Sequence, residues 1–260
     1  FAAEDPEVVA VAIAVDYADA LRSNDAAAQA EAVEAARALL ETRRDDMLLI
    51  KVDIDALTRV QRFSAALDAV DAALDRFPFD PELNQTKLNI LATLEDLAGL
   101  GEHLRAMVER FPENREIRTA LVRWYVANDD VDGAEAFVRD FVAKSGDEVE
   151  PRLALIQFLL QLRGTDAALA ELDSMIAAGG DVGRFQLYRA TMTFDAGERE
   201  AAIESLRSHI DGLEASDTRR EMQTTLARML LTTGEEDEAR AIVDEVLGDN
   251  SGVTGVRIEN

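Results

Sequence analysis

The apolar positions of this chain recur with a step of 34 residues. The tripeptide Arg-Phe-Pro occurs at 76–78 and again at 110–112, each time after an apolar run and before a polar turn. When the sequence is aligned with itself in steps of 34 residues, apolar residues coincide in three columns that lie four residues apart. Residues with this spacing lie on one face of an α-helix. The columns contain Ala66, Leu100, Ala134, Ala168 and Ala202, then Val70, Leu104, Val138, Leu172 and Leu206, then Leu74, Val108, Val142, Ile176 and Ile210.

A second apolar stripe precedes these columns in each step. It passes through Ile50, Ile54 and Leu57 and has counterparts at Leu88 and Leu91, at Leu121, Val122 and Tyr125, and at Leu155, Ile156 and Leu159. Each step therefore predicts two amphipathic helices joined by a short turn, and only stacked copies bury both stripes. The predicted fold is all-α, an α-solenoid of about seven helix-turn-helix repeats. The units are expected near 13–46, 47–80, 81–114, 115–148, 149–182, 183–216 and 220–253, with a tail at 254–260.

Capping and turn signals agree with this register. Asp5-Pro6-Glu7 and Asp80-Pro81-Glu82 each offer an N-cap acid, a first-turn proline and an acid that suits the helix dipole. Gly164, Gly197 and Gly234 fall where the turn within a repeat is expected. The first unit is irregular, with a longer opening helix and the turn RSND. No Pro-, Gly- or Ser-rich linker interrupts the pattern, so residues 1–253 are expected to form one elongated solenoid.

The composition favours helices and limits the classes of partner that the chain is expected to bind. Apolar residues make up 48% of the chain and aromatic residues 5%, and there is no Cys, which excludes disulfides and thiol nucleophiles. With 52 acidic and 27 basic residues the net charge is −25, which opposes binding to nucleic acid or to an anionic membrane surface. No apolar run approaches the roughly 20 residues of a membrane span. The chain starts at Phe1 without a signal region or a polar capping helix, so we expect a soluble piece of a longer protein, cytoplasmic or periplasmic.

The 34-residue helix pair resembles the tetratricopeptide repeat (TPR), whose pattern is W-x₂-L-G-x₂-Y…A-x₃-F…P. The best matches are GEREAAIESLRSHI from Gly197 and GEEDEARAIVDEVL from Gly234. The chain is similar to divergent bacterial members of the family, and the resemblance implies a right-handed superhelix. No unit has Trp at the first signature position. Four units replace the small residue of the first helix with a bulky one, which predicts altered helix crossing angles: Ile54, Leu88, Val122 and Ile156, against Ala190 and Ala227 in the sixth and seventh units.

The sequence contains few groups that could act in catalysis or bind a metal or a phosphate. The two histidines, His103 and His209, lie on second helices of different units, and His209 aligns with core positions. They make neither a catalytic triad nor a metal cluster, and no Gly-rich phosphate loop is present. Trp124 and Tyr125 are interpreted as core aromatics rather than as a stacking site for a ligand. The sequence therefore predicts neither an enzyme nor a cofactor.

In the TPR family the concave groove, lined by first helices, binds peptide segments of partner proteins, and the resemblance implies the same here. The family's groove positions fall on Lys51, Arg59, Gln85, Asn89, Arg123, Gln157, Leu160, Phe194 and Arg228. The carboxylate clamp of chaperone-binding members needs Asn four residues after its Lys, but Asp55 follows Lys51, so that clamp is broken.

The expected partner is a protein or peptide segment bearing acidic and apolar residues. Two alternatives stay open. One is a structural solenoid that self-associates through its repeat ends. The other is a helical-repeat RNA binder, which the acidic balance disfavours.

Overall fold

The computed structural model describes residues 5–250, and in this range the chain is entirely helical apart from its turns. It divides after Asp130 into two compact units, a boundary that falls within the fourth predicted repeat. The first unit contains α1 (Pro6–Ser23), α2 (Ala26–Leu40), α3 (Met47–Arg59), α4 (Phe63–Leu74), α5 (Pro81–Thr93), α6 (Leu97–Arg110) and α7 (Arg115–Ala127). The second contains α8 (Val131–Lys144), α9 (Val149–Leu162), α10 (Thr165–Ala178), α11 (Val182–Asp195), α12 (Arg199–Asp211), α13 (Asp217–Thr233) and α14 (Glu236–Asn250).

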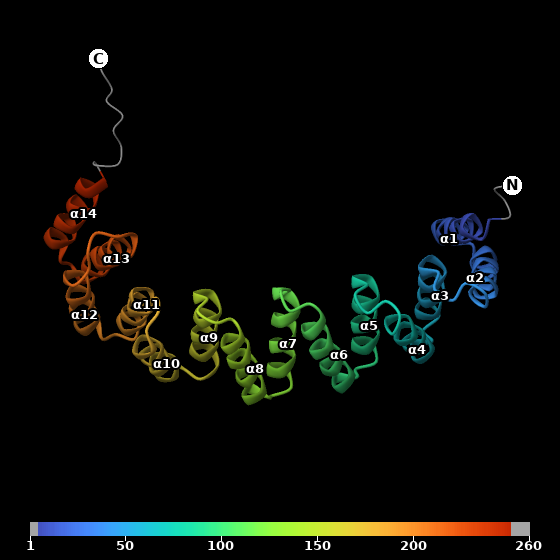
Figure 1. Cartoon of the computed structure of the whole chain (residues 1–260), viewed down its shortest axis with the longest axis horizontal. Coiled ribbons are helices and arrows are strands. Elements are labelled where there is room, and N and C mark those ends of the chain that lie inside the picture. Colours follow the sequence, from blue (N-terminus) through green and yellow to red (C-terminus); the bar gives the residue numbers. More distant parts are fainter. Residues whose placement is uncertain (1–4, 251–260) are drawn as a thin grey trace, which may run out of the picture. The chain divides into compact units, whose positions relative to one another are not determined.

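Within each unit, consecutive helices pack side by side as antiparallel pairs, as Figure 1 shows. In the first unit the pairs are α1 with α2, α3 with α4 and α5 with α6, and each second helix also packs on the next first helix. The second unit repeats this arrangement from α8 to α14. The predicted TPR-like succession of helix pairs is therefore confirmed. The expectation that residues 1–253 form a single continuous solenoid stays a prediction, and the tail at 254–260 lies outside the described residues.

The irregularities expected from the sequence are also present. The opening helix α1 has 18 residues and begins at Pro6, well before the predicted start of the first unit. Its end coincides with the RSND segment. The three extra residues ahead of the last unit lengthen α13, which has 17 residues.

Side-chain caps begin many of the helices, since a short acceptor can satisfy N–H groups that lack partners in the first turn. Asp5 accepts from the Glu7 N–H at 2.9 Å, and Asp80 accepts from the Leu83 N–H at 2.8 Å. Both of the predicted Asp-Pro-Glu starts are thus confirmed. Asn114 caps α7 in the same way, accepting from Glu116 and Ile117.

The turn within each helix pair contains one residue with a positive φ. Gly197 and Gly234 have φ values of 99° and 90°, as glycine allows without strain. Gly164 differs, because it is the N-cap of α10 and combines a φ of 92° with a ψ of 176°, a conformation essentially restricted to glycine. The other pairs place larger residues at the equivalent point: Asn24, Gln61, Glu95 and Asp129, with φ between 55° and 59°. The backbone geometry of this turn is therefore kept where the sequence lacks the glycine.

The small-residue column forms the centre of the packing. Ala66, Ala134, Ala168 and Ala202 are each 0% exposed, as expected where two helix backbones approach closely. In the third pair the column is different, because Leu100 is half-buried and the neighbouring Gly101 is buried instead.

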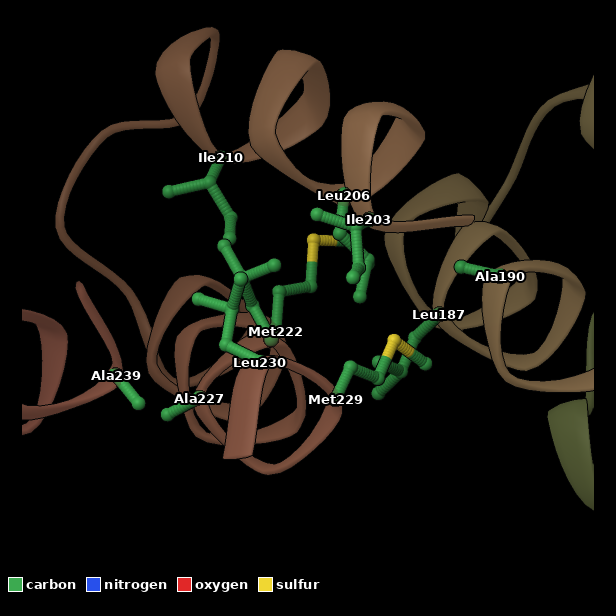
Figure 2. Close-up of a cluster of buried hydrophobic side chains, with 11 residues drawn as sticks. Leu187, Ala190, Ile203, Leu206, Ile210, Met222, Ala227, Met229, Leu230 and Ala239 are labelled. Atoms are coloured by element: carbon green, nitrogen blue, oxygen red, sulfur yellow. The ribbon is translucent and has the colours of Figure 1, made fainter. Parts of the chain in front are cut away.

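Figure 2 shows one core cluster of the second unit, in which Leu206 and Ile210 of α12 point toward Met222 and Leu230 of α13. These four side chains are at most 7% exposed. A corresponding cluster in the first unit joins Val70 and Leu74 of α4 to Leu83 of α5. A second helix and the next first helix therefore share one core.

Candidate functional site

The first helices α3 and α5 flank a cavity of about 250 Å³ on the face predicted to bind a partner. Its apolar floor is formed by Ile54, Leu83 and Ile90, which are 4%, 1% and 1% exposed. Its rim is polar and consists of Lys51, Asp55, Thr58, Glu82, Thr86, Asn89 and Thr93, with Phe63 of α4 completing the wall. The cavity thus brings together two of the predicted residues, Lys51 and Asn89.

Lys51 is already engaged with the chain's own acids. Its Nζ forms ion pairs with Glu82 and, at 3.6 Å, with Asp80, both at the start of α5. Burial on its own lowers the pKa of Lys51, but the hydrogen bond and charge of Glu82, together with Asp80, outweigh burial and raise this pKa above its usual value. Lys51 therefore stays charged, and an acidic partner would have to compete with Glu82 for it.

Arg59 is paired in a similar way. Its Nε donates to Oδ2 of Asp55 at 2.5 Å, and the Tyr17 hydroxyl donates to the same oxygen at 2.7 Å. Burial, followed by the hydrogen bond to Asp55 and its negative charge, raises the pKa of the Tyr17 phenol above its usual range. These contacts tie α1 to α3, so Arg59 and Asp55 have a structural role beside the cavity.

The remaining predicted binding residues of the first unit are more accessible to a partner. Gln85 Nε2 donates to Asn89 Oδ1 at 3.0 Å, and both side chains are exposed on α5. Arg123 is exposed on α7 and forms no ion pair or hydrogen bond through its side chain with any residue from 5 to 250. The predicted cations of this unit are Lys51, Arg59 and Arg123. Of these, Arg123 is the one without an ion-pair partner among the described residues.

In the second unit the predicted residues lie on three first helices. Gln157 and Leu160 are exposed on α9, with Leu160 40% exposed. Phe194 of α11 is half-buried against the α11–α13 core, and the guanidinium carbon of Arg199 lies 5.5 Å from its ring centre. Arg228 of α13 is exposed and donates only a 3.2 Å hydrogen bond, to Thr225. Phe194 is therefore mainly a core residue, whereas Gln157, Leu160 and Arg228 face solvent.

The sequence reasoning missed Glu82 and Tyr17, which fix the charges beside the cavity. A signal for Glu82 exists, because ion pairs between neighbouring helix pairs join residues about one repeat apart. Lys51 and Glu82 are 31 positions apart, as are Arg76 and Asp45. The pairs Arg163–Asp132 and Arg207–Glu238 have the same separation of 31.

The histidines and Trp124 lie in packed surroundings. His103 is buried at 4% exposure, with Nε2 3.3 Å from the Asn84 carbonyl oxygen, and His209 is half-buried with Nδ1 2.5 Å from the Ser205 carbonyl oxygen. Trp124 is half-buried against α6, where its Nε1–H donates to the Leu97 carbonyl, and its assignment to the core stays a prediction.

Two further features are absent from the part of the chain that the structure describes. No group of three His, Asp or Glu side chains there is arranged to hold a metal ion. Over the same residues, no helix combines the length and apolar character needed to cross a membrane.

No protein-family model and no curated protein matches the chain. Among solved structures, it is similar to one of Naa15/Naa10 bound to HypK-THB, with 18% identity, 91% of this chain covered and a TM-score of 0.45. This chain spans 36% of the length of that protein.

Two further similar structures are TPR proteins by their descriptions. A tetratricopeptide repeat protein from Parabacteroides merdae is 13% identical, with 92% of this chain and 93% of that chain covered and a TM-score of 0.42. YrrB, described as a TPR protein with an unusual peptide-binding site, is 17% identical, with 78% and 99% covered and a TM-score of 0.36. At such low identities the similarity concerns the helix-pair fold alone.

Proposed function

We propose that this chain is a non-catalytic interaction scaffold that binds a segment of a partner protein on the faces of its first helices. The observation that carries this proposal is the cavity between α3 and α5. An apolar floor with a rim of hydroxyl, amide and charged groups suits one anchoring side chain of a peptide, because the floor buries its apolar part and the rim bonds the adjacent backbone.

In each unit taken separately, the exposed side chains of the first helices favour a segment with acidic and apolar residues. Arg123 has no partner of its own among the described residues, and Arg228 has only the Thr225 hydroxyl, so neither has to give up an ion pair to bind a carboxylate. Arg can hold a carboxylate through two parallel hydrogen bonds. Leu160 offers exposed apolar area on α9. Lys51 and Arg59 contribute less than a reading of the sequence suggests, since each is already paired.

The experiment selects peptides that bind the whole chain from a random displayed library and measures their dissociation constants by titration calorimetry. Two variants test the surface: Asn89→Trp, which fills the cavity from an exposed position, and Arg123→Glu, which reverses the uncommitted charge. The matched control is Arg62→Glu, an exposed arginine at the turn between α3 and α4.

Peptides rich in Asp, Glu and apolar residues are expected, with binding weakened at least ~10-fold by each surface variant and unchanged by the control. Circular dichroism melting should be the same for all four proteins, because every changed side chain is exposed. If the selected peptides bind the two surface variants as tightly as the parent, the first-helix surface is not the binding site and the proposal fails.

A further inference from the structure

The last helix, α14, exposes apolar residues at positions that are buried in α4 and α12. Val243 and Leu247 are 43% and 62% exposed. The left-handed turn residues Gly197 and Gly234 align α14 with α12, which places Val243 and Leu247 at the positions of Leu206 and Ile210. Leu206 and Ile210 are only 1% and 7% exposed. Among residues 5–250, nothing covers the face of α14 that corresponds to this buried interface.

The first helix, α1, has the complementary feature. The turn residues Asn24 and Gln61 align Ala12 and Val15 of α1 with Leu49 and Val52 of α3. Leu49 and Val52 pack against the preceding pair and are 0% and 6% exposed, whereas Ala12 is exposed and Val15 is 51% exposed. With Val8 and Val11, both 47% exposed, these residues make an i, i+3, i+4, i+7 stripe, which we call the α1 stripe.

Inside the chain these two kinds of surface pack against each other. Leu206 and Ile210 of α12 share a core with Met222 of α13, which occupies the position of Leu49 and hence of Ala12. Val70 and Leu74 of α4 meet Leu83 of α5 in the same register. Each such contact joins the second helix of one pair to the first helix of the next. The α1 stripe and the open face of α14 are therefore the two halves of an interface that the chain already uses.

We propose that a second copy of this chain covers the open face of α14 with its α1 stripe, so that copies associate head to tail. The two contact surfaces differ, and such a heterologous contact either closes into a ring or continues as a filament. The apolar stripes supply the attraction, since both remove exposed Val and Leu side chains from water.

Charge opposes the contact and gives it a salt dependence. Exposed acids flank both surfaces, with Glu7, Asp16 and Asp19 on α1 and Asp244 on α14, and each chain has a net charge of −25. Added salt screens this repulsion, so association should strengthen with ionic strength. Binding of an acidic peptide to arginine would show the opposite trend.

The test is sedimentation velocity of the whole chain over a ~100-fold range of concentration, at low and at high salt. The variants are Val15→Glu, which blocks the α1 stripe, and Leu247→Glu, which blocks the face of α14. The controls make the same changes at exposed apolar positions elsewhere, Val60→Glu at 65% exposure and Leu231→Glu at 56%. Glu is a good helix former, so the variants should keep the helical circular dichroism and melting of the parent.

The parent and both controls are expected to form larger species as concentration rises, and each blocked variant alone is expected to stay monomeric. An equimolar mixture of the two blocked variants should form dimers and nothing larger, because one intact α1 stripe then meets one intact face of α14. A parent that is monomeric throughout overturns the proposal. So does a Val15→Glu variant that still associates, or a mixture that stays monomeric.

Discussion

The indole ring of Trp124 on α7 lies directly over Gly101 on α6, and a Cβ atom at position 101 would overlap its six-membered ring. The Trp124 Nε1–H donates to the Leu97 carbonyl at 2.8 Å, which fixes the ring in this place. The guanidinium of Arg105 lies 4.9 Å from the ring centre on the indole. Because the indole occupies the space of the small-residue column, Gly101 is buried in this pair where the register points to Leu100.

Gly101→Ala should therefore destabilise the first unit, even though alanine is the better helix former. The new methyl group must displace the indole and its hydrogen bond, and overpacking of this kind costs ~1–3 kcal/mol. Urea unfolding measures the change. Gly248→Ala in α14, where no atom lies within 4 Å of the added Cβ, is the matched control and should be neutral or slightly stabilising. Equal stability of the Gly101→Ala variant and the parent would contradict the close contact.

Ala168 tests the packing of the small-residue column in the second unit. Its side chain is 0% exposed in α10, so Ala168→Phe forces a ring into a space filled by neighbouring helices and should cost ~1–3 kcal/mol or more. The control is Ala170→Phe on the exposed side of the same helix. Thermal unfolding followed by circular dichroism should separate the two variants, and identical melting would mean that the assigned register is wrong.

The helix pairs could be predicted because their determinants are local or periodic. Asp80 caps α5 by its own side chain, and the alanine columns follow from a fixed repeat length. The cavity beside Lys51 could not be predicted in this way, although the 31-residue spacing of the ion pairs is a signal for Glu82. Its charges depend on Tyr17 and Glu82, which reach it from other helices across spacings that side-chain volumes determine.

The predicted binding residues lie on first helices, as the register implied, but the sequence did not reveal the contacts that each of them makes. Lys51 and Arg123 look equivalent in the sequence, since both are cations at groove positions. In the structure one is paired with Glu82 and the other has no such partner among the described residues. Phe194 likewise looks like an exposed anchor by register, yet it packs against the core of its unit.

Gln61 tests the turn shared by the helix pairs. Its φ of 59° places a residue with a Cβ in the left-handed region, where non-glycine residues are strained by roughly 1–2 kcal/mol. Gln61→Gly should relieve this strain, and after the entropy cost of glycine a net stabilisation of ~0.5–1 kcal/mol is expected. The reverse change at the equivalent turn, Gly197→Gln, should destabilise by a similar amount. Chemical unfolding of both variants checks the sign, and a destabilised Gln61→Gly protein would contradict the assigned turn.

His103 makes the first unit sensitive to acid. Its ring is buried, with Nε2–H donating to the Asn84 carbonyl at 3.3 Å. Burial first, and then the charge of Lys87, lower the pKa of His103 from its usual 6.5 to about 4, with Arg110 adding to the effect and Asp71 opposing it. Since this pKa is lower in the folded state, the unfolded chain takes up the proton first as the pH falls. Stability is therefore present above about pH 6.5 and is lost progressively down to about pH 4.

The neutral variant His103→Gln keeps an amide N–H for the Asn84 carbonyl but has no proton to take up. Between about pH 7 and pH 5 the parent should lose ~2 kcal/mol of unfolding free energy that the variant does not, because each unit of pKa shift corresponds to ~1.4 kcal/mol. Urea unfolding of both proteins at both pH values gives this difference. Proton NMR titration of the His103 ring provides an independent measurement. A midpoint near 6.5, or parallel pH profiles for the two proteins, would show that His103 is not held neutral by burial.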